Sequence, residues 1–264
     1  MKNVSNPFWL LLLLILSSCQ EKLEEIDEYN LRPERLQELV PLQPGKYITY
    51  RLDSTVFTNL GLTREVHTYQ EKNVIDAAIT DAAGKPSYRV YRYLRDGSGT
   101  GPWRSAGTYF ITNTGRTVEW VEDNRRVVKL VIPVQEGNTW KGNQYLPSEP
   151  FSPEINSFSV GNALRTWDFT YEDSTAEKIG TRDLKGVRTV FHIDEKTNVN
   201  EQEKPQAENS YAARSYSLEK YAVDLGLVYQ KLILWEYQAE TTNNQSYKGR
   251  YKGFGVERTL IDHN

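Results

Sequence analysis

The chain has 264 residues, and its 32 Lys and Arg nearly balance its 35 Asp and Glu, for a formal net charge of −3. Both signs are interspersed, so the sequence carries neither a basic patch for nucleic acid nor a polybasic segment for a membrane surface. Its single cysteine excludes an intramolecular disulfide. The 17 Tyr and six Trp favour strands over helices. We therefore expect a β-rich chain without a nucleic-acid partner.

The N-terminal segment has the features of a secretion signal. Residues 8–16 form an unbroken apolar run that follows Lys2. This run is shorter than the roughly 20 residues needed to span a bilayer, but it fits the roughly 7 to 15 of a signal-peptide core. Leu16-Ser17-Ser18-Cys19 resembles the lipobox of bacterial lipoproteins. That resemblance implies that residues 1–18 are removed and that Cys19 receives a diacylglycerol and further acyl chains, which anchor it stably in a membrane.

Residues 19–41 are expected to form a tether between the lipid and the folded domain. Residues 20–25 are charged and poor in apolar side chains, which favours a solvated spacer. This acidic stretch also resembles the surface-export signal of some Bacteroidota lipoproteins, and a plain hydrophilic spacer is the alternative. Pro33, followed by Leu36, Leu39 and Val40, predicts a short helix that ends before Pro41.

From residue 46 onward the sequence alternates as half-buried antiparallel strands do. Ile48, Tyr50, Leu52 and Val56 share one face of the segment 46–57. Further strands are expected at 64–79, 87–95, 108–113, 117–122, 126–132, 167–172, 187–194, 211–221, 226–238 and 253–261. Turn signals rich in Gly, Asn and Asp separate most of them. This spacing predicts an antiparallel meander.

The segment 142–161 interrupts this pattern with Pro147, Pro150 and Pro153, which cannot donate to a strand ladder. We interpret it as a long surface loop and a soft boundary within one domain, residues 42–264. The fold class is therefore mainly β: a meander that curls into a half-barrel or barrel, with a β-sandwich as the alternative. A short N-terminal helix and a cleaved signal peptide precede it.

Three segments together resemble an uncharacterised family of Bacteroidota lipoproteins. They are 41–56 (Pro-Leu-Gln-Pro-Gly-Lys-Tyr through Asp-Ser-Thr-Val), 219–230 with its Gly-Leu-Val turn, and 253–264 (Gly-Phe-Gly-Val through Ile-Asp-His-Asn). With the lipobox, the resemblance spans the chain. It implies a cell-envelope location and a β-rich architecture, and it implies no activity.

The stretch 221–228 is also similar to a hairpin found in periplasmic half-barrel and carrier domains. Gly226 can adopt a positive φ at the corner of this hairpin. We expect four residues after it to pack inward: Leu227, Tyr229, Ile233 and Trp235.

Candidate chemistry is sparse. His192 and Asp194 lie two apart, on the strand face opposite Val187; we interpret them as an exposed pair, and a shared metal or proton is the alternative. The glycine-rich loop 96–101 leads into a strand rather than a helix, which favours a hairpin over a phosphate site. Two groups of carboxylates, at 119–123 and 168–173, could supply a glycosidase pair, which sequence alone cannot place across a cleft. We predict no catalytic residue, no metal site and no cofactor.

The aromatic residues offer the better candidates for binding. Large aromatic side chains can stack on sugars or anchor a protein partner, although in β domains they more often fill the core. Trp120 and Trp235 alternate with aliphatic residues and are expected in the core. Trp103 and Trp140 adjoin turns, and with Tyr109 they are our candidate binding residues.

These observations predict a lipoprotein of the cell envelope, anchored through Cys19 and expected in the outer membrane, on either its periplasmic or its surface face. The expected function is non-catalytic binding or scaffolding. The alternatives are a carrier of lipid or lipoprotein, which needs an apolar cavity, and a glycan-active enzyme. The expected partners are the membrane, through the lipid on Cys19, and envelope proteins or glycans.

Overall fold

The computed structural model describes residue 32 and residues 34–151, 163–242 and 245–264. The predicted signal peptide, Cys19 and most of the predicted tether lie outside these residues. The described part of the tether contains α1 (Glu34–Leu39), the short helix that the sequence predicts. None of the helices within the described ranges is long and apolar enough to cross a membrane.

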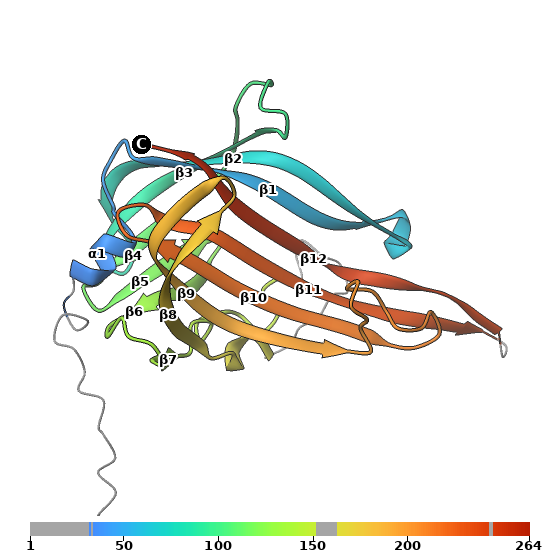
Figure 1. Cartoon of the computed structure of the whole chain (residues 1–264). Helices are drawn as coiled ribbons and strands as arrows, with labels where there is room; N and C mark the ends of the chain where they lie inside the picture. The colour runs from blue at the N-terminus through green and yellow to red at the C-terminus, as the bar shows by residue number, and fades with distance from the viewer. Residues whose placement is uncertain (1–31, 33, 152–162, 243–244) are drawn as a thin grey trace, which may run out of the picture.

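The described strands form one 12-stranded sheet in the order β6-β5-β4-β3-β2-β1-β12-β11-β10-β9-β8-β7. Their bounds are β1 (Tyr47–Thr58), β2 (Thr63–Thr80), β3 (Pro86–Asp96), β4 (Arg104–Asn113), β5 (Thr117–Glu122), β6 (Arg125–Val131), β7 (Thr139–Trp140), β8 (Phe169–Ile179), β9 (Arg182–Thr197), β10 (Ala212–Ala222), β11 (Gly226–Thr242) and β12 (Gln245–His263). Consecutive strands pair as a meander except β6 and β7, which are the two edges of the sheet, and the first and last strands, β1 and β12, pair with each other (Figure 1). The mainly β antiparallel fold is confirmed, and the single curled sheet is a barrel rather than a sandwich.

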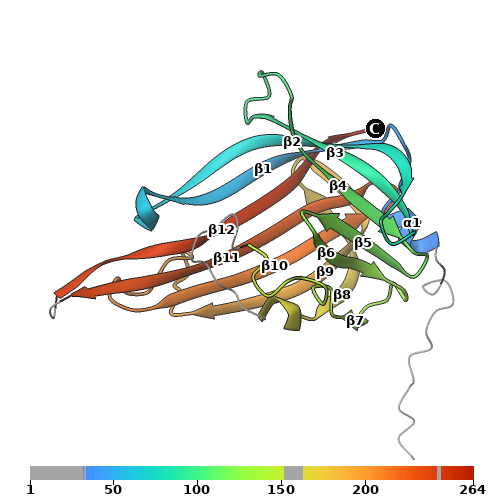
Figure 2. The ribbon, with the colours of Figure 1, turned by 180° about the vertical axis from the view of Figure 1, so that it is seen from behind.

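The two ends of the sheet meet at a seam between β6 and the β7 to β8 region, which lie on the same side of the molecule (Figure 2). Val128 of β6 receives a hydrogen bond on its carbonyl from Trp140 Nε1 (2.8 Å) and donates its N–H to the carbonyl of Gly142 (2.8 Å). Tyr171 Oη accepts from the Val131 N–H (3.0 Å) and donates to the Val131 carbonyl (2.8 Å). Side chains and loop backbone thus bridge the edges, so the barrel is nearly closed.

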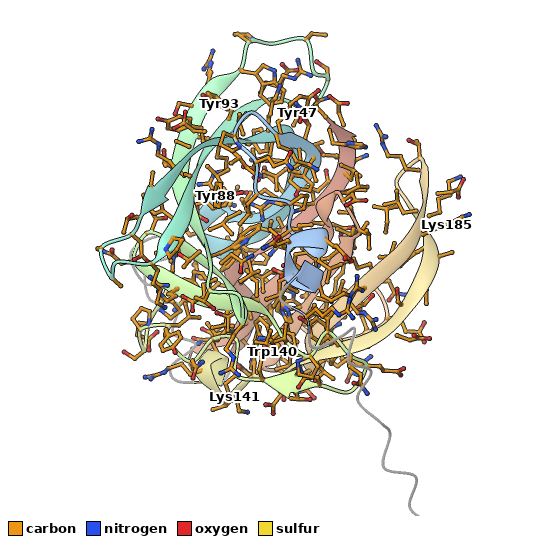
Figure 3. The ribbon with its side chains drawn as sticks, turned by 90° about the vertical axis from the view of Figure 1, so that its left-hand side faces the viewer. Tyr47, Tyr88, Tyr93, Trp140, Lys141 and Lys185 are labelled. Atoms are coloured by element: carbon orange, nitrogen blue, oxygen red, sulfur yellow. The ribbon has the colours of Figure 1, made fainter. Side chains whose placement is uncertain are left out.

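The helix α1 packs against one end of the barrel, which faces the viewer in Figure 3. Leu36 and Leu39 are fully buried within the main interior cluster, as the apolar stripe of the helix requires. The backbone N–H of Asp224, in the turn between β10 and β11, donates to the Glu38 carbonyl (2.7 Å). This bond fixes the helix to the sheet.

The predicted inward packing after Gly226 is only partly correct. Gly226 does take a positive φ of 103°, and Leu227 is buried in the interior cluster. A β-bulge opposite the step from Lys220 to Tyr221 leaves Val228 as an extra residue. The alternation is therefore reset. Three residues predicted to face inward pack on the other face of β11: Tyr229, Ile233 and Trp235.

The segment after β7 is only partly a surface loop over its described length, since Tyr145 is 56% exposed while residues before and after it are buried. Asn143 and Leu146 are 6% exposed, and Leu146 belongs to the interior cluster. The ring of Phe151 contacts that of Phe254 edge to face, with centroids 4.9 Å apart. The prolines do stop strand pairing here, but the chain turns into the barrel because its apolar residues find partners there.

Candidate functional site

The interior of the barrel holds a cavity of about 540 Å³. This volume lies within the range of about 300 to 1,000 Å³ that is typical of small-molecule sites. Its lining comes from both halves of the sheet, from the segment after β7, and from Leu164 and Trp167 just before β8. The cavity is therefore formed by the nearly closed barrel as a whole and by no single hairpin.

On the wall formed by β11 and β12 the lining changes from polar to apolar along the strands, while charged residues of the β5–β6 hairpin also line the end near Phe151, whose ring centroid lies 5.5 Å from the Arg125 guanidinium. Three cross-strand pairs of β11 and β12 show this order: Gln230 with Arg258, Leu232 with Val256, and Leu234 with Phe254. The polar pair lies nearer to α1 than the two apolar pairs do. The reason is that β11 begins at the end of the barrel next to α1, and Gln230 follows Leu227 closely along this strand. Phe151 and Leu146 extend the apolar part. A ligand that matches this lining would be polar at one end and apolar at the other.

Buried charged side chains cross-link the polar part. Arg258 donates two hydrogen bonds of 3.0 Å to the Glu71 carboxylate and one of 2.6 Å to Gln230 Oε1. Gln230 Nε2 donates to Glu219 Oε1 (2.8 Å), and Lys129 forms an ion pair with the same carboxylate. Glu71 and Glu219 are 2% and 0% exposed. Such charges persist in a barrel interior only when they are paired and hydrogen-bonded.

Pairing decides the protonation of these groups. Burial alone would raise the pKa of Glu219, but the Lys129 ammonium and its hydrogen bonds hold that pKa below its usual value. Burial acts in the same sense on Glu71, and the Arg258 guanidinium outweighs it, so the pKa of Glu71 is also lowered. Both carboxylates are therefore ionised at neutral pH.

The remaining charged residues of the lining are paired as well. Arg92 contacts Glu122 (2.5 Å), and Arg125 contacts Asp123 (2.8 Å). With the two pairs of the network, the cavity is lined by four cationic and four anionic side chains among the described residues. The site thus carries no net charge.

His192 faces the interior of the barrel, so the predicted exposed pair with Asp194 is wrong. Its ring stacks on Phe169 with centroids 3.5 Å apart, and its Nδ1 lies 2.8 Å from Ser217 Oγ. Asp194 is exposed and pairs with Arg214. The reason is a β-bulge: Ser217 pairs with Ile193 and the next residue, Leu218, with Phe191, so His192 is an extra residue and the period of two is broken.

The hydrogen bond between Ser217 and His192 is the pairing of a nucleophile with a general base, but the environment opposes that chemistry. Burial lowers the pKa of His192 to about 3. An imidazole with this pKa accepts a proton poorly at neutral pH. Its Nε2 is buried without a hydrogen-bond partner among the described residues, so no carboxylate orients it. The arrangement can hold a ligand by hydrogen bonds, and it lacks the parts of a catalytic triad.

We expect the buried neutral His192 to make the fold sensitive to acid. In the unfolded chain the pKa returns to about 6.5, so between pH 6.5 and 3 the unfolded state binds a proton that the folded state does not. Stability therefore falls as pH falls, by about 2 kcal/mol between pH 7 and 5. Urea unfolding of wild type and His192→Phe at both pH values measures this contribution. His67→Gln, at an exposed histidine, should keep the wild-type pH dependence. Equal pH dependence in wild type and His192→Phe would contradict the assignment.

Of the candidate binding residues, Tyr109 lines the cavity, where its ring lies beside that of Trp120. Trp103 lies outside it, beneath the Arg95 guanidinium, which is 4.2 Å from the ring centroid. Trp140, labelled in Figure 3, is half-buried at the seam, and its N–H is used by Val128. Cys19 lies outside the described residues.

Sequence reasoning missed most residues of the polar lining. Asn73, Lys129, Glu219 and Arg258 are polar residues on strands, and a period of two assigns such residues to the solvent face. Trp120, expected in the core, is half-buried and borders the cavity, whereas Trp235 is 2% exposed and is core as predicted. No local signal separates an inward polar residue from an outward one.

Fold and site together define the protein as a nearly closed antiparallel β-barrel with a mixed polar and apolar cavity in its interior. No protein-family model matches the chain, and no curated protein matches it. Among solved structures, it is similar to a "putative exported protein with YmcC-like fold" from Bacteroides fragilis NCTC 9343, with a TM-score of 0.34 and 10% identity over 83% of this chain and 97% of that one. It is also similar to a "putative outer membrane lipoprotein-sorting protein domain" from Vibrio parahaemolyticus, with a TM-score of 0.18 and 9% identity over 88% and 91% of the two chains. Scores this low do not assign the chain to either fold family.

Proposed function

We propose that this protein is a non-catalytic binding protein of the cell envelope that holds one small amphiphilic ligand in the barrel cavity. The carrying observation is the cavity itself, which is large enough for a ligand and whose β11–β12 wall changes from hydrogen-bonding and charged at Gln230 and Arg258 to apolar at Leu234 and Phe254. Amphiphilic ligands match such a lining because each end finds its own kind of surface. The lipobox at Cys19 supports the envelope location.

A carrier would use the same cavity, and the apolar lining around Leu232 and Phe254 favours an acyl chain as cargo. The two functions differ in the fate of the bound ligand. A carrier releases its ligand to acceptor vesicles, whereas a binding module retains it.

Binding in the cavity can be measured with the uncharged fluorescent amphiphile N-phenyl-1-naphthylamine and the purified full chain. We expect saturable binding of one equivalent. Val256→Trp places a large ring in the apolar part of the cavity, so the affinity should fall by about tenfold or more, or at least about 1.4 kcal/mol.

The matched control is Val66→Trp, which makes the same replacement at a position that is 57% exposed. This variant should bind the probe as wild type does, and circular dichroism should show that both variants fold. Unsaturable binding, or equal loss in the two variants, would refute the cavity as the site.

Anchoring through Cys19 is tested separately. We expect Cys19→Ala to abolish incorporation of radiolabelled palmitate and to leave an unprocessed precursor of higher mass, because the thiol carries the lipid. Ser18→Ala retains a small residue before the cysteine and should be labelled normally. Undiminished labelling of Cys19→Ala would show that the chain is not lipidated at this residue.

A further inference from the structure

Three side chains that line the cavity carry buried polar atoms without a hydrogen-bond partner in the described part of the chain. They are Asn73 Oδ1, Trp120 Nε1 and His192 Nε2. Asn73 is 5% exposed and His192 is 6% exposed. Buried polar atoms are nearly always hydrogen-bonded, because leaving one unpaired forfeits its interaction with water. Three strands, β2, β5 and β9, each bring one residue with such an atom to the lining of the same cavity, which points to a shared ligand.

The chemistry of these atoms defines what they can bind. Asn73 Nδ2 already donates to Glu71 Oε1 (2.8 Å), so its Oδ1 needs a donor. Trp120 Nε1 can only donate, so it needs an acceptor. His192 is neutral, and its Nε2 donates or accepts according to the role that Nδ1 takes toward Ser217. A hydroxyl group satisfies all of these, since it both donates and accepts.

Charged head groups satisfy the site less well. A carboxylate cannot donate to Asn73 Oδ1, and an ammonium cannot accept from Trp120 Nε1. The cationic and anionic side chains of the lining are also paired with one another, as with Lys129 and Glu219. An added charge would therefore lose its hydration without gaining an unpaired counter-ion. The balance of the site favours an uncharged ligand.

We infer that the ligand of this cavity is an uncharged amphiphile with a hydroxyl-bearing head, which hydrogen-bonds to Asn73, Trp120 and His192 while its hydrocarbon part lies along Leu232, Leu234 and Phe254. This inference rests on the proposed binding function and specifies its ligand class. The three residues select the head group, and the apolar residues contribute affinity through buried area.

The test uses three competitors with the same hydrocarbon chain: 1-decanol, decanoate and decylamine. Each is titrated at pH 7 against the bound N-phenyl-1-naphthylamine on the purified full chain. Decanol should displace the probe at the lowest concentration. Trp120→Phe and Asn73→Leu should each weaken decanol by about fivefold to tenfold, the loss of one hydrogen bond, and should change decanoate and decylamine little.

The matched control is Trp235→Phe. Trp235 Nε1 is also buried without a partner in the described residues, but it lies in a separate cluster with Tyr251. This variant should bind decanol as wild type does. The inference is overturned if decanoate or decylamine competes as well as decanol, or if Trp120→Phe and Asn73→Leu behave like Trp235→Phe. If Val256→Trp still abolishes probe binding in that case, the proposed binding function stands and only the inferred ligand class is wrong. If the wild-type protein binds no probe, both the binding function and the ligand class are overturned.

Discussion

Replacing Glu219 with alanine is expected to lower the free energy of unfolding by about 3 to 5 kcal/mol. Glu219 is fully buried and forms the ion pair with Lys129, which is 9% exposed. It also accepts hydrogen bonds from Tyr221 Oη (2.7 Å) and Gln230 Nε2 (2.8 Å). Alanine would leave a buried ammonium, the buried Tyr221 hydroxyl and the half-buried Gln230 amide without their partner. Urea unfolding followed by tryptophan fluorescence measures the loss.

A double variant separates the charge from the packing. Lys129→Met with Glu219→Leu removes both charges and keeps apolar volume, so it should be much closer to wild type than Glu219→Ala. The exposed pair of Lys141 and Asp168, 2.7 Å apart, is the control, and Asp168→Ala should cost less than about 1 kcal/mol. If the double variant were as unstable as Glu219→Ala, an unpaired charge would not be the cause.

Gly253→Ala is expected to lower the free energy of unfolding by about 3 kcal/mol or more. Gly253 has a φ of +119°, and an added Cβ would lie 2.1 Å from the Leu234 carbonyl oxygen and 2.7 Å from Trp235 Cα. These atoms belong to the backbone of β11, so the neighbouring strand itself would have to move. The long ladder between β11 and β12 would be disrupted in its middle.

Gly84→Ala is the matched control for this prediction. Gly84 also has a positive φ, of +76°, but an added Cβ there meets no atom within 4 Å. It should cost only the backbone strain of about 1 to 2 kcal/mol. If urea unfolding showed equal losses of unfolding free energy in Gly253→Ala and Gly84→Ala, the close contact with β11 would be unimportant. The backbone strain at a positive φ would then account for the whole effect.

Local alternation predicted most strands to within a few residues. The segment 46–57 became β1 (Tyr47–Thr58), and 211–221 became β10 (Ala212–Ala222). The pattern underestimated β8, β9 and β12, and it did not find the two-residue β7. Register shifts interrupt β8 and β9, and at each bulge the period of two is lost. Long hairpins with polar residues on both faces also lack the apolar alternation that marks a half-buried strand.

The cavity was beyond the reach of the same reasoning. Tyr109 was a candidate because of its residue type, whereas Asn73 and His192 either looked solvent-facing or formed an apparent exposed pair. Polar residues can be buried on the inner face of a strand only if hydrogen-bonding or ionic partners on other strands reach them. Those partners are distant in the chain: Lys129 and Glu219 are 90 residues apart, and Glu71 and Arg258 are 187 apart.

The β class, the order of the hairpins and the turn at Gly226 could be predicted from the amino-acid sequence, because these depend on local sterics and on the period of side chains along a strand. The folded structure was needed to show which polar residues face inward, how β6 and β7 approach each other, and that the barrel interior contains a cavity. These features depend on bulges and on register between strands far apart in sequence. A change of one residue in register exchanges the two faces of a strand, so no local pattern could contain them.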